Sequence, residues 1–195
     1  MPTHDVRFKE IEHKYEVADD FDLDRFRAAV MAMRPIRTNA IQVRDRYFLT
    51  ETGRQSRFLL RHRLDTEIQQ LTLKSLGDDT EVRDEVNLDL GHHAGDQSLA
   101  VDAFVHYLGV RWSGTITKDI AVWYFDDCEV VHYRATTGAR AVRCVEFEAT
   151  RKDSVADALA IVERYERATG LHGLGRSRAS LPQLLFPELR DLLVV

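Results

Sequence analysis

The chain of 195 residues has only two cysteines, four prolines and no long apolar run. Two cysteines, Cys128 and Cys144, are too few for a disulfide framework or a cysteine-based zinc site, which favours reduced thiols. A membrane-spanning helix needs about 20 consecutive apolar residues, and no segment approaches that length. The polar first residues, MPTHDVRFKE, lack the apolar stretch of a secretory signal peptide. We therefore expect a cytoplasmic protein that is not inserted in a membrane.

The sequence also has no excess of positive charge. Its 27 basic and 32 acidic residues give a formal net charge of −5, so the chain as a whole does not attract nucleic acid or an anionic membrane. We expect no nucleic-acid partner, and any anion-binding site must be assembled locally by the fold. The ten glycines and four prolines form no linker-like segment, so we expect a single domain over residues 1–195.

Two series of short strands dominate the predicted secondary structure. Alternating hydrophobicity and turn residues predict strands at about residues 8–17, 40–50, 56–64, 67–75, 80–90, 115–125, 128–135 and 140–150. Apolar residues at helical spacing predict helices at about 22–34, 98–108 and 154–169, and a short helix is expected in the C-terminal tail. Gly53 is expected to supply the special backbone conformation of a turn after the second strand.

The expected fold is an α+β protein, a closed eight-stranded antiparallel β-barrel with helices packed on the outside. Short turns join antiparallel neighbours, and a large antiparallel sheet tends to close because closure removes exposed edges. An open sheet with one face in water is the alternative.

Charged residues occupy one face of at least five of these strands. Successive side chains of a strand point to opposite faces, so the first strand places Glu10, Glu12 and Lys14 on one face and Ile11 and Tyr15 on the other. Because the helices need the apolar faces, the charged faces are expected to line the interior of the barrel. The later strands contribute Arg61, Arg63, Thr72, Lys74, Arg83, Glu85, Glu146 and Glu148 to the charged faces.

An interior of this kind favours a charged ligand, since unpaired buried charges carry a large desolvation cost. Arginine and lysine bind phosphate oxygens through charge-assisted hydrogen bonds. Glu-x-Glu pairs supply the hard oxygen ligands that Mg²⁺ or Mn²⁺ prefer, and these metals also bind substrate phosphates. The pattern predicts a cationic tunnel for phosphoryl transfer, with metal ligands at Glu10, Glu12, Glu146 and Glu148.

Seven short motifs, in the same order along the chain, resemble those of the CYTH family, also called triphosphate tunnel metalloenzymes. Two positions depart from the family pattern. Leu49 stands where the second-strand motif has an aspartate, and residues 128–137 lack an aspartate that many members have, with Arg134 near its expected place. The seven motifs, within residues 6–180, are Glu10-x-Glu12-x-Lys14, Tyr47-Phe48, Leu60-Arg61-His62-Arg63, Leu71-Thr72-Leu73-Lys74, Arg83-x-Glu85, Glu146-x-Glu148 and Ser177-Arg178.

The resemblance implies that a triphosphate is hydrolysed or cyclised inside the barrel. It assigns Lys14 and Glu85 to catalysis and places one or two divalent metals on the four glutamates, with a second metal or a nearby carboxylate such as Glu85 positioning and deprotonating the attacking water. Lys118, the single basic residue of the sixth strand, is a further candidate for binding phosphate. The residues that the resemblance places around the phosphates are Lys14, Arg61, Arg63, Lys74, Arg83 and Arg178.

Three functions stay open on the sequence alone. One is a metal-dependent triphosphatase acting on inorganic triphosphate or an organic triphosphate. Another is a class IV-type adenylate cyclase, although nothing marks an adenine pocket. The third is a non-catalytic module that binds polyphosphate or a nucleotide, which the missing aspartates favour. The substrate is not specified, because phosphate-binding side chains do not read the group attached to the phosphates. A homodimer through an outer apolar surface is compatible with the sequence.

Overall fold

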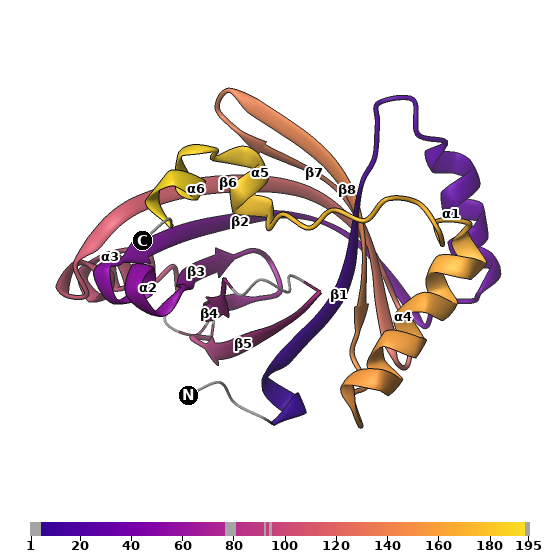
Figure 1. Cartoon of the computed structure of the whole chain (residues 1–195), viewed down its shortest axis with the longest axis horizontal. Coiled ribbons are helices and arrows are strands. Elements are labelled where there is room, and N and C mark those ends of the chain that lie inside the picture. The colour runs from indigo at the N-terminus through magenta and orange to yellow at the C-terminus, as the bar shows by residue number, and fades with distance from the viewer. Residues whose placement is uncertain (1–4, 77–80, 92, 94, 194–195) are drawn as a thin grey trace.

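The computed structural model describes residues 5–76, 81–91, 93 and 95–193, and eight strands within these ranges form a closed antiparallel barrel (Figure 1). Around the barrel the order is β1-β5-β4-β3-β2-β6-β7-β8, and β8 returns to β1. The predicted α+β barrel is therefore confirmed, and each strand has two neighbours. The strands are β1 (Lys9–Glu16), β2 (Arg37–Thr50), β3 (Phe58–Leu64), β4 (Gln69–Ser75), β5 (Val82–Asp89), β6 (Val110–Tyr124), β7 (Cys128–Thr137) and β8 (Arg140–Ala149).

Strands β2 and β6 are longer than predicted and form the longest ladder of the barrel. Their pairing runs from Arg37 opposite Tyr124 to Thr50 opposite Val110, with a register shift at the last step. The added residues are largely polar, so the alternation of apolar residues did not reveal them. The fifth strand was expected from about residue 80, which lies outside the described residues.

The predicted turn around Gly53 is wrong. Residues Glu51–Ser56 form a short helix, α2, whose first turn is capped by Thr50 Oγ1, which accepts a hydrogen bond from the Gly53 amide at 2.9 Å. The left-handed conformation belongs to Arg57, with a φ of 55°. Glycine is needed at position 53 for space, because a Cβ there would lie 2.7 Å from the Phe58 carbonyl oxygen.

Two helices cover the outer face of the barrel beside β1, β7 and β8, as Figure 1 shows: α1 (Leu23–Ala32) and α4 (Val155–Thr169). The side chain of Asp22 accepts a hydrogen bond from the Arg25 amide, and that of Ser154 accepts one from the Asp157 amide, so both helices have side-chain N-caps. Their apolar faces pack on the outward side chains of the strands, as expected. The buried cluster includes Ile11, Tyr15, Phe26, Val30, Val130, Val145, Phe147, Ala158 and Val162.

A buried polar contact connects α4 to β1. The Tyr15 hydroxyl donates a hydrogen bond to Glu166 Oε1 at 2.6 Å, and His13 Nδ1 lies 2.6 Å from the same oxygen. Burial raises the pKa of Glu166, but the hydrogen bonds with His13 and Tyr15 outweigh burial and hold that pKa below its usual value. The carboxylate therefore satisfies two polar groups on an otherwise apolar face.

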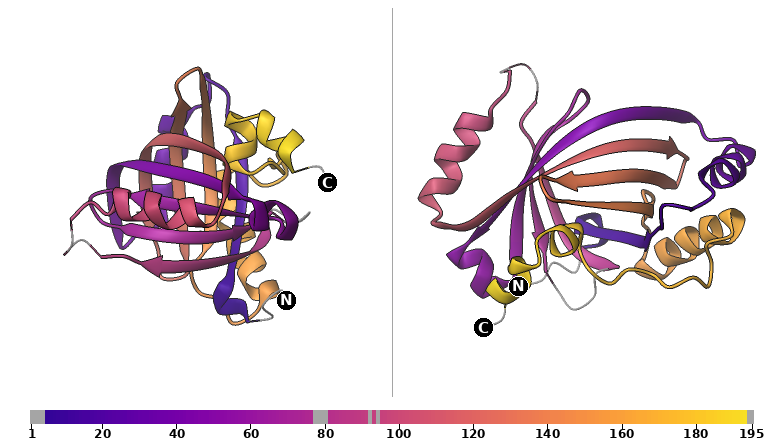
Figure 2. Two further views of the ribbon diagram at one scale, coloured as in Figure 1. Left: turned by 90° about the vertical axis from the view of Figure 1, so that its left-hand side faces the viewer. Right: turned by 90° about the horizontal axis from the view of Figure 1, so that it is seen from above.

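The remaining helices lie on other parts of the barrel surface (Figure 2). A one-turn 3-10 helix (Val6–Phe8) precedes β1, and α3 (Ser98–Tyr107) packs Val101 and Val105 on the outer face of β2, β3 and β4. The tail forms two short helices, α5 (Leu181–Leu185) and α6 (Glu188–Leu192). Within the described ranges, no helix combines the length and apolar character needed to cross a membrane.

The tail helices complete an apolar cluster at one end of the barrel. Leu49 is fully buried in this cluster, so the position where the family pattern has an aspartate serves packing in this chain. The cluster contains Tyr47, Leu49, Leu59, Leu76, Ile116, Leu181, Leu185 and Leu189.

Candidate functional site

The barrel encloses a cavity of about 170 Å³, and all eight strands contribute to its wall. Because side chains alternate along each strand, the charged residues point into this cavity while their apolar neighbours pack under the helices. The structure thus brings together most of the residues that the sequence marks as site candidates. Those on the cavity wall are Glu10, Glu12, Lys14, Arg61, Arg63, Lys74, Arg83, Glu85, Lys118, Glu146 and Glu148.

Arg178 lies outside the cavity wall. Its side chain is 61% exposed, and its Nη1 lies 2.8 Å from Glu81 Oε2. Arg176 lies beside it, with Nε 3.1 Å from the other oxygen of Glu81. The Ser177 amide donates a hydrogen bond to the Lys14 carbonyl oxygen at 2.7 Å, so this segment runs along the first strand.

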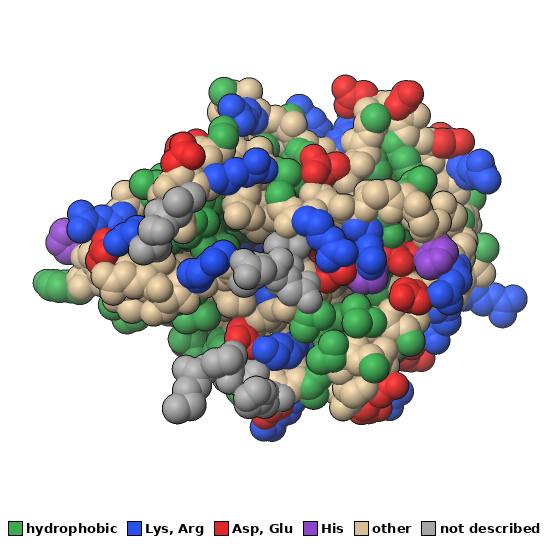
Figure 3. Space-filling view, viewed as in Figure 1, with side chains coloured by type: hydrophobic (Ala, Val, Ile, Leu, Met, Phe, Trp, Pro, Cys, Tyr) green, Lys and Arg blue, Asp and Glu red, His purple; other side chains and the backbone are tan. Residues whose placement is uncertain are grey.

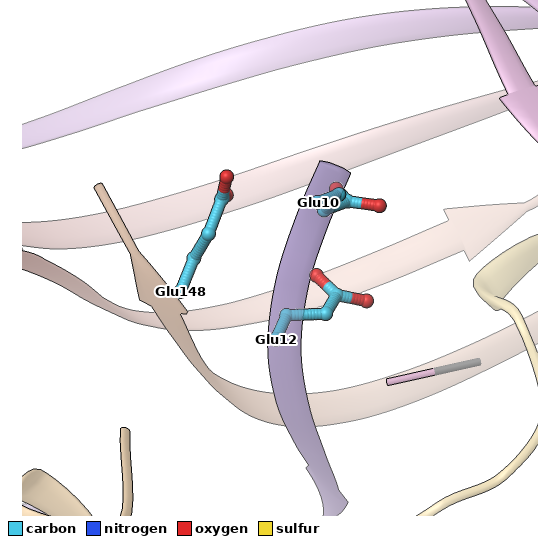
Figure 4. Close-up of side chains that lie close together, drawn as sticks. All are labelled: Glu10, Glu12 and Glu148. Atoms are coloured by element: carbon cyan, nitrogen blue, oxygen red, sulfur yellow. The ribbon is translucent and has the colours of Figure 1, made fainter. Parts of the chain in front are cut away.

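Three of the four glutamates predicted as metal ligands form a cluster. Glu10, Glu12 and Glu148 each have a carboxylate oxygen within 4.8 Å of the others (Figure 4). Glu12 and Glu148 are direct cross-strand neighbours on β1 and β8. Glu146 is oriented differently: it accepts a hydrogen bond from the Tyr133 hydroxyl at 2.6 Å and lies 3.1 Å from Lys14 Nζ.

The cluster has the electrostatics of a cation site. Burial raises the pKa of Glu148 well above its usual value, and the nearby charges of Glu10, Glu85 and Glu12 raise it further. Burial raises the pKa of Glu10 too, but the charges of Arg83 and Lys74 outweigh burial and hold it well below its usual value. Clustered carboxylate oxygens of this kind are the donors that Mg²⁺ and Mn²⁺ prefer, so the residues present fit such a metal.

A chain of ion pairs connects this cluster to the adjacent strands β5 and β4. The Arg83 guanidinium contacts both Glu10 and Glu12. Lys74 Nζ lies 2.7 Å from Glu10 Oε1 and 2.6 Å from Glu85 Oε2. In the part of the chain that the structure describes, the cavity wall carries six basic and eight acidic side chains, so the interior is mixed rather than cationic.

Asp45 was missed in the sequence, although it organises the far side of the cavity. It is fully buried, and its carboxylate accepts hydrogen bonds from Arg63 Nε at 2.8 Å and Nη2 at 3.0 Å, while Lys118 Nζ lies 2.6 Å away. Burial raises the pKa of Asp45, but Arg63 and Lys118 outweigh burial and hold it well below its usual value. Burial and the charge of Arg63 lower the pKa of Lys118 to about 8. Asp45 and Tyr47 are two residues apart on β2, so their side chains point to the same face. This spacing is the sequence signal that could have placed Asp45 beside the cavity.

Glu129 is a second acid that the sequence reading overlooked. It lies on β7 directly across from Glu148 and contributes to the cavity wall, and burial raises its pKa. This residue falls within the stretch that lacks the expected aspartate. Nearby on the wall is Tyr124, whose ring lies 3.9 Å from the guanidinium carbon of Arg37. Apolar side chains add to this part of the cavity, namely Ile41, Ile68, Val122 and Val131.

Known structures share this architecture. Neither a family model nor a curated protein matches the sequence. The PH1012 protein from Pyrococcus horikoshii superposes with a TM-score of 0.71 at 18% identity, over 90% of this chain and 99% of that one. A candidate adenylate cyclase from Bacillus halodurans gives a TM-score of 0.58 at 17% identity, over 92% and 99% of the two chains.

A plant protein gives a similar result. HpAC1 from Hippeastrum, a candidate adenylyl cyclase described as having a dominant triphosphatase activity, gives a TM-score of 0.59 at 16% identity, over 95% of this chain and 97% of that one. Identities of 16 to 18% establish likeness of fold, and function must be argued from the site. The chain has the closed eight-stranded fold of the CYTH, or triphosphate tunnel, domain.

Proposed function

We propose that the chain hydrolyses a triphosphate inside the barrel in a reaction that depends on a divalent metal. The observation that carries the proposal is the cluster of Glu10, Glu12 and Glu148 beside a ring of arginines and lysines in one enclosed cavity. Carboxylates that hold a metal next to cations that bind phosphate are the equipment of phosphoryl transfer. The triphosphatase activity described for HpAC1 supports the proposal at the level of fold.

The charge of the cavity explains why a metal is needed. With more acidic than basic side chains on its wall, the described part of the cavity does not attract a polyanion by itself. Mg²⁺ or Mn²⁺ held by Glu10, Glu12 and Glu148 would neutralise these acids and the charge that develops on the phosphate being transferred. The basic side chains then contact the remaining phosphate oxygens.

Two cations are placed to bind those oxygens. Arg61 is buried, and its Nε has no hydrogen-bond partner among the described residues, which leaves one donor free for a ligand. Lys14 lies between Glu12 at 3.2 Å and Glu146 at 3.1 Å, so two carboxylates hold its ammonium group at the cavity wall. We assign both side chains to phosphate binding, with Lys14 placed beside the metal ligands and therefore beside the reacting phosphate.

Glu85 is assigned to the attacking water. Its carboxylate lies 2.6 Å from Lys74 Nζ and 3.6 Å from Arg61 Nη2, so two cations hold it at the cavity wall. A bound triphosphate competes for the same two cations. As Lys74 and Arg61 turn to the phosphates, the Glu85 carboxylate is released to position the attacking water and accept its proton.

The alternative of binding without catalysis rested on two missing aspartates. Leu49 belongs to the apolar cluster at one end of the barrel, and Glu129 places a carboxylate on the cavity wall beside Glu148. The cavity is therefore not short of acids, which supports the hydrolase.

The test is phosphate release from tripolyphosphate, ATP and thiamine triphosphate with Mg²⁺ or Mn²⁺. Glu148→Gln should abolish release, whereas Glu163→Gln, which changes a half-exposed glutamate of α4, should leave it unchanged. The ATP reaction is also assayed for cyclic AMP, whose formation would identify a cyclase. Circular dichroism confirms folding of each variant. Absence of release from all three compounds by folded wild-type protein would overturn the proposal.

A further inference from the structure

A second cavity, of about 410 Å³, lies on the outer surface of the barrel. Its floor is the outward face of β6, β7 and β8, and its wall is the segment that leads from β1 into α1. Cavities of roughly 300 to 1,000 Å³ are typical of small-molecule sites. This cavity is separate from the tunnel, because neighbouring residues of β7 point to opposite faces: Tyr133 lines the tunnel, and His132 and Arg134 line the outer cavity.

Positive charge collects in the outer cavity without full compensation. Arg134 and Arg143 are direct cross-strand partners on β7 and β8, an arrangement that is unfavourable for like charges. Asp119 is the cross-strand partner of Arg134 on its other side, but its carboxylate accepts a hydrogen bond from Gln42 at 3.0 Å instead. Arg134 has no ion-pair partner in the described ranges of the chain. Two arginines are therefore cross-strand neighbours, and one of them has no ion-pair partner among the described residues.

The other basic residues of this cavity have weak partners. Arg143 lies 3.2 Å from Asp19, and Arg27 lies 3.9 Å from Asp24, but both aspartates are almost fully exposed. Exposed ion pairs of this kind contribute little, so an incoming anion can replace them. Burial and the charges of Arg27 and Arg143 lower the pKa of His132. At neutral pH this histidine is therefore uncharged.

The wall opposite the arginines is apolar. Phe21 and Leu23, from the segment before α1 and its first turn, line the cavity together with Ala121 of β6. Figure 3 shows basic side chains at the upper edge of the molecule, between the β7–β8 hairpin and the loop before α1. The cavity thus offers guanidinium groups to one end of a ligand and apolar surface to the other.

We propose that this outer cavity binds a compact organic phosphate, with its phosphate on Arg134 and Arg143 and its apolar part against Phe21 and Leu23. Arginine matches phosphate geometry because its planar group donates two parallel hydrogen bonds. Binding removes the repulsion between the two cross-strand arginines and gives Arg134 the partner that it lacks. The proposal stands independently of the tunnel chemistry, since the two cavities lie on opposite faces of the sheet.

Calorimetric titration of the full chain with phenylphosphonate tests the proposal, because its carbon–phosphorus bond resists hydrolysis. Arg134→Gln and Arg143→Gln should each weaken binding by about tenfold or more. Arg140→Gln, which removes an exposed arginine of the same hairpin, is the control and should stay within about twofold of wild type. Lys74→Gln weakens phosphate binding in the tunnel, so binding that this variant keeps belongs to the outer cavity. Methylphosphonate, which lacks the ring, should bind more weakly than phenylphosphonate.

Each contrary result has a definite meaning. Wild-type affinity of Arg134→Gln, or no binding by wild-type protein at about 10 mM, overturns the site. Loss of binding in Lys74→Gln alone places the ligand in the tunnel and also overturns it. A loss of affinity in Arg140→Gln that equals the loss in Arg134→Gln shows that surface charge alone attracts the ligand, and it overturns the site. Equal affinity for the two phosphonates refutes the apolar half of the site. Thermal unfolding confirms that each variant is folded.

Discussion

Replacement of Asp45 by asparagine is expected to destabilise the barrel strongly. The carboxylate is fully buried and is shared by Arg63, at 2.8 and 3.0 Å, and Lys118, at 2.6 Å. Asparagine has nearly the same size but no charge, so both cations would stay inside the barrel without their partner. Removal of one partner of a buried ion pair costs about 3 to 5 kcal/mol. We expect the free energy of unfolding to fall by that amount.

Urea unfolding at pH 7, followed by tryptophan fluorescence, measures the loss. Asp102→Asn is the matched control, because it removes the same group from a half-exposed ion pair with Arg46 on α3 and β2. Exposed pairs are worth at most about 1 kcal/mol, so the control should change the free energy of unfolding by less than that. An equal, small effect of Asp45→Asn and Asp102→Asn would refute the reasoning.

The pH dependence of the Asp45→Asn penalty provides an independent check. Lys118 has a pKa of about 8 in the folded wild-type protein, against 10.5 for an ordinary lysine. Loss of the Asp45 charge lowers that folded pKa further. At a pH below this lowered pKa, Lys118 is charged in both proteins, and the variant loses the whole interaction with the carboxylate. Above about pH 8, Lys118 is neutral in both proteins. The penalty should therefore shrink as the pH rises from this lowered pKa to about 8, leaving the part due to Arg63. A penalty that grows above pH 8 would contradict this.

Three further changes have expected outcomes. Tyr124→Ala should raise the KM for ATP or thiamine triphosphate by about tenfold, because the organic group of these substrates reaches the apolar part of the cavity. The KM for tripolyphosphate, which has no organic group, should not change. Equal changes in KM for all three substrates in phosphate-release assays would contradict this. Glu166→Gln should cost about 1 to 3 kcal/mol at pH 7 in urea unfolding. That cost should shrink as the pH falls below 4.5, since the carboxylate then becomes protonated; a constant cost would point to lost packing instead. Gly114→Ala places a Cβ 2.7 Å from the Phe186 ring and should cost about 1 to 3 kcal/mol in thermal unfolding, whereas Gly138→Ala, with open space around it, should not. Equal melting temperatures for the two glycine variants would show that Phe186 moves aside.

The barrel could be predicted because its determinants are local. Alternation places Glu10, Glu12 and Lys14 on one face of β1, and the closed fold turns that face inward. The helix after β2 could not be predicted in the same way. Thr50 is an adequate N-cap, but Gly53 in the middle of a six-residue segment suggests a turn, and the space that Phe58 requires there depends on the tertiary structure.

The site could be predicted only in part, because pairing depends on neighbours that are distant in sequence. The alternation of side chains predicted most of the charged residues of the cavity wall but not their ion-pair partners, so the wall was expected to be cationic. Asp45 could not be assigned from local sequence, because its partners Arg63 and Lys118 come from other strands. The position of Arg178 depends on Glu81, which holds its guanidinium outside the cavity wall. None of these pairings has a signature in local sequence.

The pairing of β1 with β8, which closes the barrel, also affects how the chain folds during its synthesis. β1 emerges first from the ribosome, yet one of its two neighbours is β8, so Glu12 meets Glu148 only after most of the chain has been synthesised. At roughly 5 to 20 residues per second, β1 waits on the order of ten seconds for that strand. Pairings across such long loops are slow to form, and an unpaired strand edge invites aggregation in the meantime. Charged side chains disfavour such edge pairing, and those that alternate along β1 are the ones that later face the cavity.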